Sequence, residues 1–121
     1  YRAVTCNIMP DHVNILSLTD LEMKTVSSIL KALGHPVRLN IVRMLFETKR
    51  PLHIKAFSRS LGVDYAAIYR HIETLKKAGI LEAYEVGRSR VLTLIKPDVV
   101  KQLLETSKKL SAEKGSLKEY S

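Results

Sequence analysis

The chain has 121 residues, 45% of them hydrophobic, which suits one domain with a single core. No apolar run approaches the roughly 18 residues that a membrane-spanning helix needs, and residues 1–19 lack the layout of a secretory signal. We therefore predict no membrane segment and expect a cytoplasmic protein. Because Cys6 is the only cysteine, the sequence excludes an intrachain disulfide and a thiolate cluster within one chain.

Positive charge is the strongest compositional signal. The formal net charge is +8 and the isoelectric point is about 9.7, a balance that favours a polyanionic partner through counterion release. Between Lys49 and Arg90, nine Lys or Arg residues stand against four acidic residues. More than half of the excess charge thus lies in about a third of the chain, and a nucleic acid is the partner that this favours.

Residues 1–19 show no long period. They form either a strand from Ala3 to Ile8 followed by a loop, or a disordered extension. Cys6 is a small apolar residue of that strand or, with His12, part of an intersubunit site or a redox switch; an intersubunit disulfide is a further alternative.

Apolar residues at three- and four-residue steps predict two helices after this extension, over 20–33 and 36–47. Asp20 is the expected N-cap of the first helix, and Gly34 ends it. Pro36 suits the first turn of the second helix, where its missing N–H costs nothing.

A short third helix over 54–61 ends at Gly62, and Asp64 caps a fourth helix over 65–77 that Gly79 terminates. The three-residue turn 62–64 between them gives helix-turn-helix proportions. Two β-rich runs follow, 80–86 and 91–95, joined by a basic tip over 87–90.

The last predicted helix begins at Pro97 and Asp98 and has an apolar stripe. The expected fold class is mainly α with a small β-hairpin: a winged helix-turn-helix of five helices. Its DNA-binding domain spans 20–97, a C-terminal helix spans 98–114, and the tail 115–121 is frayed.

Helix 65–77 divides into two faces at about 100° per residue. Ala67, Ile68, His71, Ile72, Leu75 and Ala78 gather on the core side. The outward side presents Arg70, whose guanidinium can bind guanine O6 and N7 in a fork, and Tyr69, which can touch a thymine methyl or a phosphate. The alternative is the ordinary solvated face of a basic protein.

Arg88 and Arg90 at the hairpin tip contribute little to folding, because exposed charges stabilise weakly. Contacts with phosphates or the minor groove explain them better. A solvated turn with incidental arginines is the alternative.

Three ordered strings, LKALGHPVRLNIVRML, LHIKAFSRSLGVDYAAIYRHIETLKKAGIL and YEVGRSRVLTL, resemble the ArsR-type winged-helix transcriptional regulators over about residues 25–105, including metal-independent archaeal members. The resemblance implies base contacts from Tyr65, Ala66, Tyr69 and Arg70, and wing contacts from Arg88 and Arg90. It also implies a homodimer joined through the first and last helices. The interface residues would be Leu21, Met23, Val26, Ile29, Leu30, Val99, Val100, Leu103, Leu104 and Leu110.

The sequence departs from this family at its best-known metal site. Residues 52–61 lack the usual pair of cysteines, so we expect no soft-metal sensing there, and His53 either caps the third helix or faces solvent. His71 should pack at the core boundary and His35 should support the turn before Pro36. The four histidines lack ligand spacing, and no catalytic constellation is present. We expect no metal, no cofactor and no enzymatic activity.

The resulting hypothesis is a sequence-specific regulator, a repressor in the simplest case, that binds a roughly palindromic double-stranded site as a homodimer. Two alternatives stay open: a sequence-indifferent chromatin-type binder, and a winged helix used for protein contacts in a transcription or replication assembly. Phosphates would be neutralised by Lys49, Lys55, Lys76, Lys77, Arg88 and Arg90.

Overall fold

The computed structural model describes residues 17–112. Its elements are α2 (Asp20–Leu33), α3 (Pro36–Thr48), β1 (Leu52–His53), α4 (Ile54–Leu61), α5 (Tyr65–Lys77), β2 (Leu81–Val86), β3 (Ser89–Leu94) and α6 (Pro97–Ala112). The expected fold class is confirmed, although the sheet has three strands instead of two. The hypotheses for Cys6, His12 and the tail 115–121 lie outside the described residues. No helix within residues 17–112 is long and apolar enough to cross a bilayer.

Two helix starts depend on side-chain caps. Thr19, and not Asp20 as expected, is the N-cap of α2: its hydroxyl accepts from the Glu22 N–H at 3.1 Å, and the Glu22 carboxylate accepts from the Thr19 N–H at 2.9 Å. This reciprocal pair satisfies two otherwise free donors, which a cap at Asp20 would not do. At α3, Nδ1 of His35 accepts from the Val37 N–H at 3.1 Å, so His35 supports the turn as predicted.

The helix-turn-helix is formed by α4, residues 62–64 and α5. Gly62 ends α4 with a left-handed φ of 65°, a conformation that glycine adopts without steric cost. The Ser58 hydroxyl donates to the Val63 carbonyl at 2.7 Å, and the Asp64 carboxylate caps α5 by accepting from the Ala66 N–H. His53 occupies the N-cap position of α4, but it makes no capping hydrogen bond there and is exposed.

The wing corrects two expectations. In the antiparallel order β1-β3-β2, Leu52 pairs with Leu92, so the chain contributes a short strand between the helices predicted over 36–47 and 54–61, where we expected none. Val86 pairs with Ser89, which leaves a two-residue turn, and Gly87 at its first position has a φ of 62°. Arg88 therefore lies at the tip, whereas Arg90 belongs to β3.

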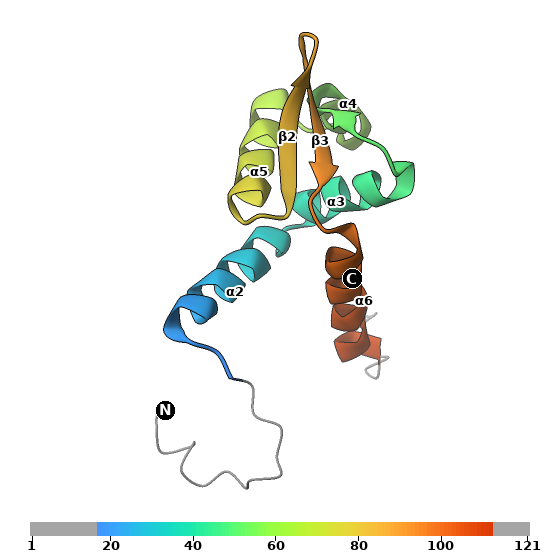
Figure 1. Cartoon of the computed structure of the whole chain (residues 1–121). Coiled ribbons are helices and arrows are strands. Elements are labelled where there is room, and N and C mark those ends of the chain that lie inside the picture. The colour runs from blue at the N-terminus through green and yellow to red at the C-terminus, as the bar shows by residue number, and fades with distance from the viewer. Residues whose placement is uncertain (1–16, 113–121) are drawn as a thin grey trace, which may run out of the picture.

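Figure 1 shows how the elements are arranged. The hairpin of β2 and β3 stands between α4 and α5, and its tip points away from α2 and α6, which extend from the other end of the domain. The N-terminal end of α5 lies toward the wing tip and its C-terminal end toward α2. The two ends of α5 thus face different surroundings.

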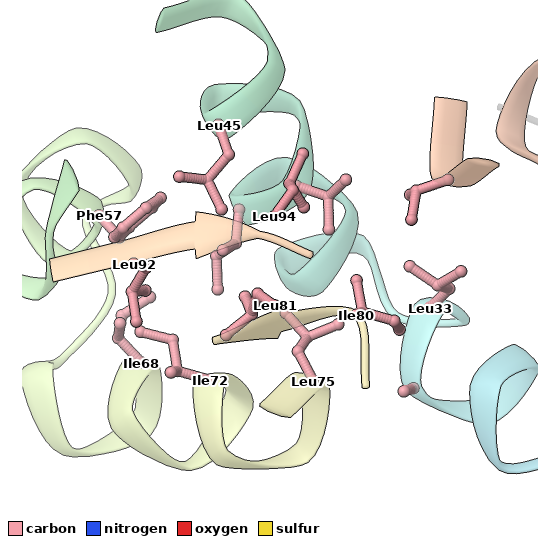
Figure 2. Close-up of a cluster of buried hydrophobic side chains, with 14 of the residues drawn as sticks. Leu33, Leu45, Phe57, Ile68, Ile72, Leu75, Ile80, Leu81, Leu92 and Leu94 are labelled. Carbon is pink, nitrogen blue, oxygen red and sulfur yellow. The ribbon is translucent and has the colours of Figure 1, made fainter. Parts of the chain in front are cut away.

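The core forms where α5 packs against the sheet and the other helices (Figure 2). Phe57 from α4, Leu45 from α3 and Leu92 from β3 meet the buried side of α5. That side consists of Ile68, Ile72 and Leu75, all of which are almost fully buried.

We expect Ile68→Ala to lower the free energy of unfolding by about 2–5 kcal/mol, because the substitution leaves a cavity beneath α5. The measurement is urea denaturation followed by circular dichroism. Val86→Ala in the wing serves as the control, because Val86 is 56% exposed; it should change stability by less than about 0.5 kcal/mol. Similar losses for the two variants would contradict the assignment of Ile68 to the core.

Candidate nucleic-acid interface

The candidate base-reading residues lie on the first turns of α5. Tyr65, Ala66, Tyr69 and Arg70 are all exposed, whereas Ile68 between them is fully buried. The packing of Ile68 therefore fixes which side of the helix faces outward. These four residues belong to the N-terminal half of α5, and that end of the helix lies nearer to the wing tip (Figure 1).

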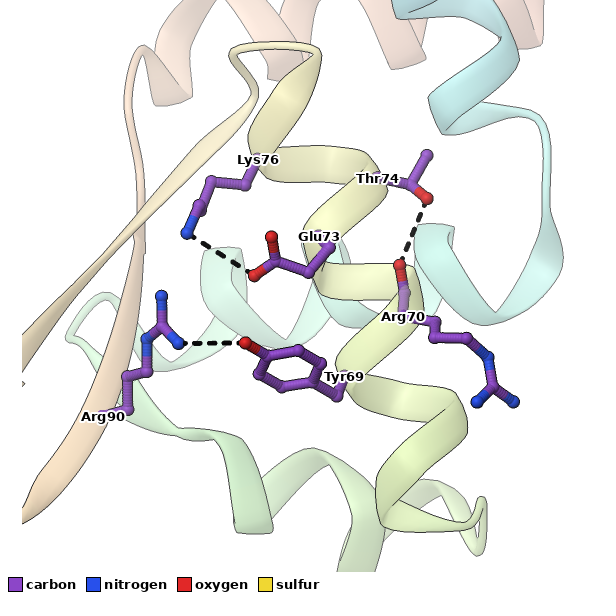
Figure 3. A network of polar contacts seen from close by, with 6 residues as sticks. All are labelled: Tyr69, Arg70, Glu73, Thr74, Lys76 and Arg90. Carbon is purple, nitrogen blue, oxygen red and sulfur yellow. Dashed lines mark hydrogen bonds and ion pairs between the residues drawn. The ribbon is translucent and has the colours of Figure 1, made fainter.

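A direct contact joins the wing to this helix. Nη1 of Arg90 donates to the Tyr69 hydroxyl at 3.3 Å, and its guanidinium carbon lies 5.9 Å from the centroid of the tyrosine ring. Figure 3 shows the two side chains reaching toward each other while Arg70 extends away from the wing. The two residues are 21 positions apart in the sequence, and no sequence pattern predicted their contact. Within residues 17–112, the Arg70 side chain forms no hydrogen bond or ion pair, and Arg88 is the exposed arginine of the wing.

The other predicted phosphate contacts differ in their surroundings. Lys49 and Lys55 are exposed; Lys55 lies in α4, whereas Lys49 follows α3 and lines a pocket with residues of α6. Lys76 pairs with Glu73 at 3.5 Å. Lys77 lines a pocket with residues of α2. Lys76 and Lys77 are thus at the end of α5 that lies away from the wing tip, and they are weaker candidates for contacts beside the reading residues.

On a single chain, most residues of the predicted dimer surface are exposed to solvent. Leu21 on α2 is 74% exposed and Leu110 on α6 is 84% exposed, and Met23, Val26, Leu30 and Val99 are exposed as well. Val100 must be removed from the set: it is 8% exposed because it packs into the core of its own chain. Ile29, Leu103 and Leu104 are partly buried against that core.

Arg38 links three helices in a network that sequence reasoning missed. Its Nε donates to Nδ1 of His71 on α5 at 3.1 Å, and its Nη1 donates to the carbonyls of Lys31 and Ala32 in the last turn of α2. The His35 and His71 rings lie 4.6 Å apart. The string GHPVR contained Arg38 and His35, but only the fold shows that His71 is their partner.

Burial lowers the pKa of the His71 imidazole below its usual value, and the positive charges of His35, Arg38 and Arg70 lower it further. The neutral ring fits the geometry, because Nδ1 must keep its lone pair to accept from Arg38. His71 is thus at the core boundary, as predicted. Within residues 17–112, no three His, Cys, Asp or Glu side chains lie close enough together to hold a metal ion.

Known proteins share both sequence and fold with this chain. Residues 33–83 match the family model described as a helix-turn-helix domain. An uncharacterised HTH-type transcriptional regulator of Mycobacterium tuberculosis is 26% identical over 89 residues, which cover 74% of this chain and 76% of that protein. Its crystal structure superposes with a TM-score of 0.65 and 23% identity, over 78% of this chain and 93% of that one.

Two further structures have the same fold. The homodimeric winged helix-turn-helix DNA-binding domain of a possible ArsR-family regulator from Mycobacterium bovis gives a TM-score of 0.67 at 20% identity, covering 84% of this chain and 94% of its own. HlyU from Vibrio cholerae gives 0.63 at 22% identity, covering 78% and 99%. The chain is therefore a winged helix-turn-helix protein. The winged helix-turn-helix fold that the resemblance to ArsR-type regulators implied is confirmed.

The histidine network makes stability depend on pH. Because the pKa of His71 is lowered by folding, the unfolded chain takes up the proton first on acidification. The free energy of unfolding should thus fall as the pH drops below about 6.5 and level off below the depressed pKa. Urea denaturation at a series of pH values measures this slope. His71→Asn, which keeps an acceptor for Arg38, should flatten it.

The exposed residue His53 provides the matched control, since His53→Asn should retain the slope of the unmodified chain. If His71→Asn retained the slope and His53→Asn removed it, the assignment to His71 would be wrong.

Proposed function

We propose that the chain is a DNA-binding transcriptional regulator of the ArsR type, a non-enzymatic protein that acts in the cytoplasm by reading double-stranded DNA with α5. One observation supports this most strongly. The four candidate base-contacting residues are exposed on the first turns of α5, and the wing is joined to the same surface through the Tyr69–Arg90 contact. A helix for the major groove and a hairpin for the flanking backbone are thus presented together.

The contacts divide by chemistry. Arg70 is the proposed reader of sequence, because a guanidinium can bind guanine in a fork, and Tyr65, Ala66 and Tyr69 contribute shape and apolar contact. Arg88, Lys49 and Lys55 would neutralise phosphates. Arg90 is a positioning residue that holds the wing near Tyr69.

The proposed active form is a homodimer joined through the exposed apolar residues of α2 and α6. It would place its two α5 helices in successive major grooves, about 34–36 Å apart, on a roughly palindromic site. Repression by blocking polymerase is the simplest outcome. The homodimeric state of the structurally similar M. bovis domain supports this arrangement.

Selection of bound sites from a random duplex library tests sequence reading. On the selected site, Arg70→Ala should weaken binding by about 1–3 kcal/mol and relax the preference at one position, because a base contact is lost. Arg88→Ala should weaken selected and random duplexes alike and reduce the dependence of affinity on salt, because a phosphate contact is lost. Affinities are measured by fluorescence anisotropy at several salt concentrations.

If no site is enriched and both variants lose equally on all duplexes, the protein is a sequence-indifferent binder, an alternative that its net charge of +8 favours. If the unmodified chain binds no duplex at all, the winged helix serves protein contacts instead.

The dimer is tested by placing a charge in the proposed interface. Leu30→Glu should shift sedimentation equilibrium toward the monomer, because Leu30 is 52% exposed and would be buried between protomers. Lys24→Glu, about 120° from Leu30 around α2, is the control and should leave the dimer intact. A dimer that withstood Leu30→Glu would require an interface elsewhere.

A further inference from the structure

A pocket of about 490 Å³ lies between α2 and the C-terminal half of α5, with Arg38 of α3 at its side. Its lining contains four cationic side chains and no carboxylate. Three hydroxyl groups and one small apolar side chain complete it. The lining residues are Lys24, Ser27, Ser28, Lys31, Ala32, Arg38, Thr74 and Lys77.

The α2 part of this lining is one helix face. Lys24, Ser27, Ser28 and Lys31 follow the spacing i, i+3, i+4, i+7, which places them in line along a helix. At about 100° per residue, this face points away from Val26 and Leu30. A second copy that packs on those two residues would meet a different side of α2, and Leu21 is the residue of the proposed interface that borders the pocket.

The positive charge of the pocket is not compensated from within the domain. None of its four cationic side chains forms an ion pair with a residue in the range 17–112, where the only such pair is Lys76 with Glu73. Within the same range, the hydroxyls of Ser27 and Ser28 donate to no other group, whereas the Thr74 hydroxyl donates to the Arg70 carbonyl at 3.1 Å. Arg38 is held by its bonds to His71, Lys31 and Ala32, which use Nε and Nη1 and leave Nη2 free among the described residues.

We propose that this pocket binds the phosphate group of a small anionic ligand. A phosphate accepts several charge-assisted hydrogen bonds at once, and ammonium, guanidinium and hydroxyl donors are the groups that supply them. A fixed arginine between flexible lysines also lowers the entropy lost on binding, because part of the site is already ordered.

Its position argues against a DNA phosphate as the occupant. Tyr65 and Lys77 lie at opposite ends of α5, about 18 Å apart at the helical rise per residue. The N-terminal end of α5 lies toward the wing tip and its C-terminal end toward α2 (Figure 1), and the pocket is lined by α2 and by Thr74 and Lys77 from that C-terminal end. We therefore assign Lys77 to the pocket instead of the DNA backbone. The assignment does not depend on the proposed reading of DNA by α5.

Titration of the isotopically labelled full chain with sodium pyrophosphate tests the proposal. The ionic strength is held constant with sodium chloride, and the backbone amide shifts are followed by NMR. We expect saturable shifts in residues 24–31 and 74–77. The double variant K24Q/K31Q should weaken binding at least tenfold, and K101Q/K108Q, which removes the same charge from exposed lysines of α6, should leave it unchanged.

Shifts that grow linearly without saturation, or equal losses in the two double variants, would show diffuse attraction to a basic surface and overturn the proposal. A random-sequence duplex forms the second arm of the experiment. If the duplex shifts residues 24–31 and pyrophosphate does not, the pocket holds a DNA phosphate and the small-ligand assignment is wrong. Both substituted lysines of the pocket are exposed, and an unchanged circular dichroism spectrum verifies that the variants fold.

Discussion

The burial of one side of α5 is the constraint on which the other features depend. Ile68, Ile72 and Leu75 are removed from water against the sheet and the neighbouring helices. Burial of such side chains stabilises by about 1.5–3 kcal/mol each, so together they contribute an amount comparable to the whole net stability of a small domain. Rotating α5 to present a different side would forfeit this energy. The outward position of Tyr65, Tyr69 and Arg70 is therefore a consequence of core packing.

The helices were predictable because their signals are local. Apolar spacing, Pro36, Asp64 and the glycines that follow α4 and α5 act within a few residues, and the bounds of α2, α4 and α5 agree with the sequence expectation. The sheet was less predictable. Two residues, Leu52 and His53, form β1 only because β3 offers them a partner about 40 residues away, and a two-residue strand has no periodicity of its own. The hairpin tip predicted over 87–90 was too long for a related reason. Pairing with β2 makes Ser89 and Arg90 part of β3.

For the candidate site, too, the features set by local sequence were predictable and the contacts between elements were not. The outward face of α5 followed from helical spacing, which is why all four proposed reading residues are exposed. The contacts between elements did not follow from spacing. Arg90 contacts Tyr69 and Arg38 contacts His71 because separate segments pack together. Val100 is not available for the proposed dimer surface because it packs into the core of its own chain.

Some cationic side chains stabilise the folded chain, and others do not. Lys76 and Lys77 in the last turn of α5 and Lys31 in the last turn of α2 interact favourably with the helix dipole, worth about 0.3–1 kcal/mol each at an exposed site. Arg70 in mid-helix, Arg88 at the wing tip and Lys24 in the second turn of α2 gain no such benefit. Because these three residues contribute little to folding, the proposed ligands account for their presence better than folding does. They point to two different places, the reading end of α5 and the pocket beside α2, and a single DNA surface does not explain both.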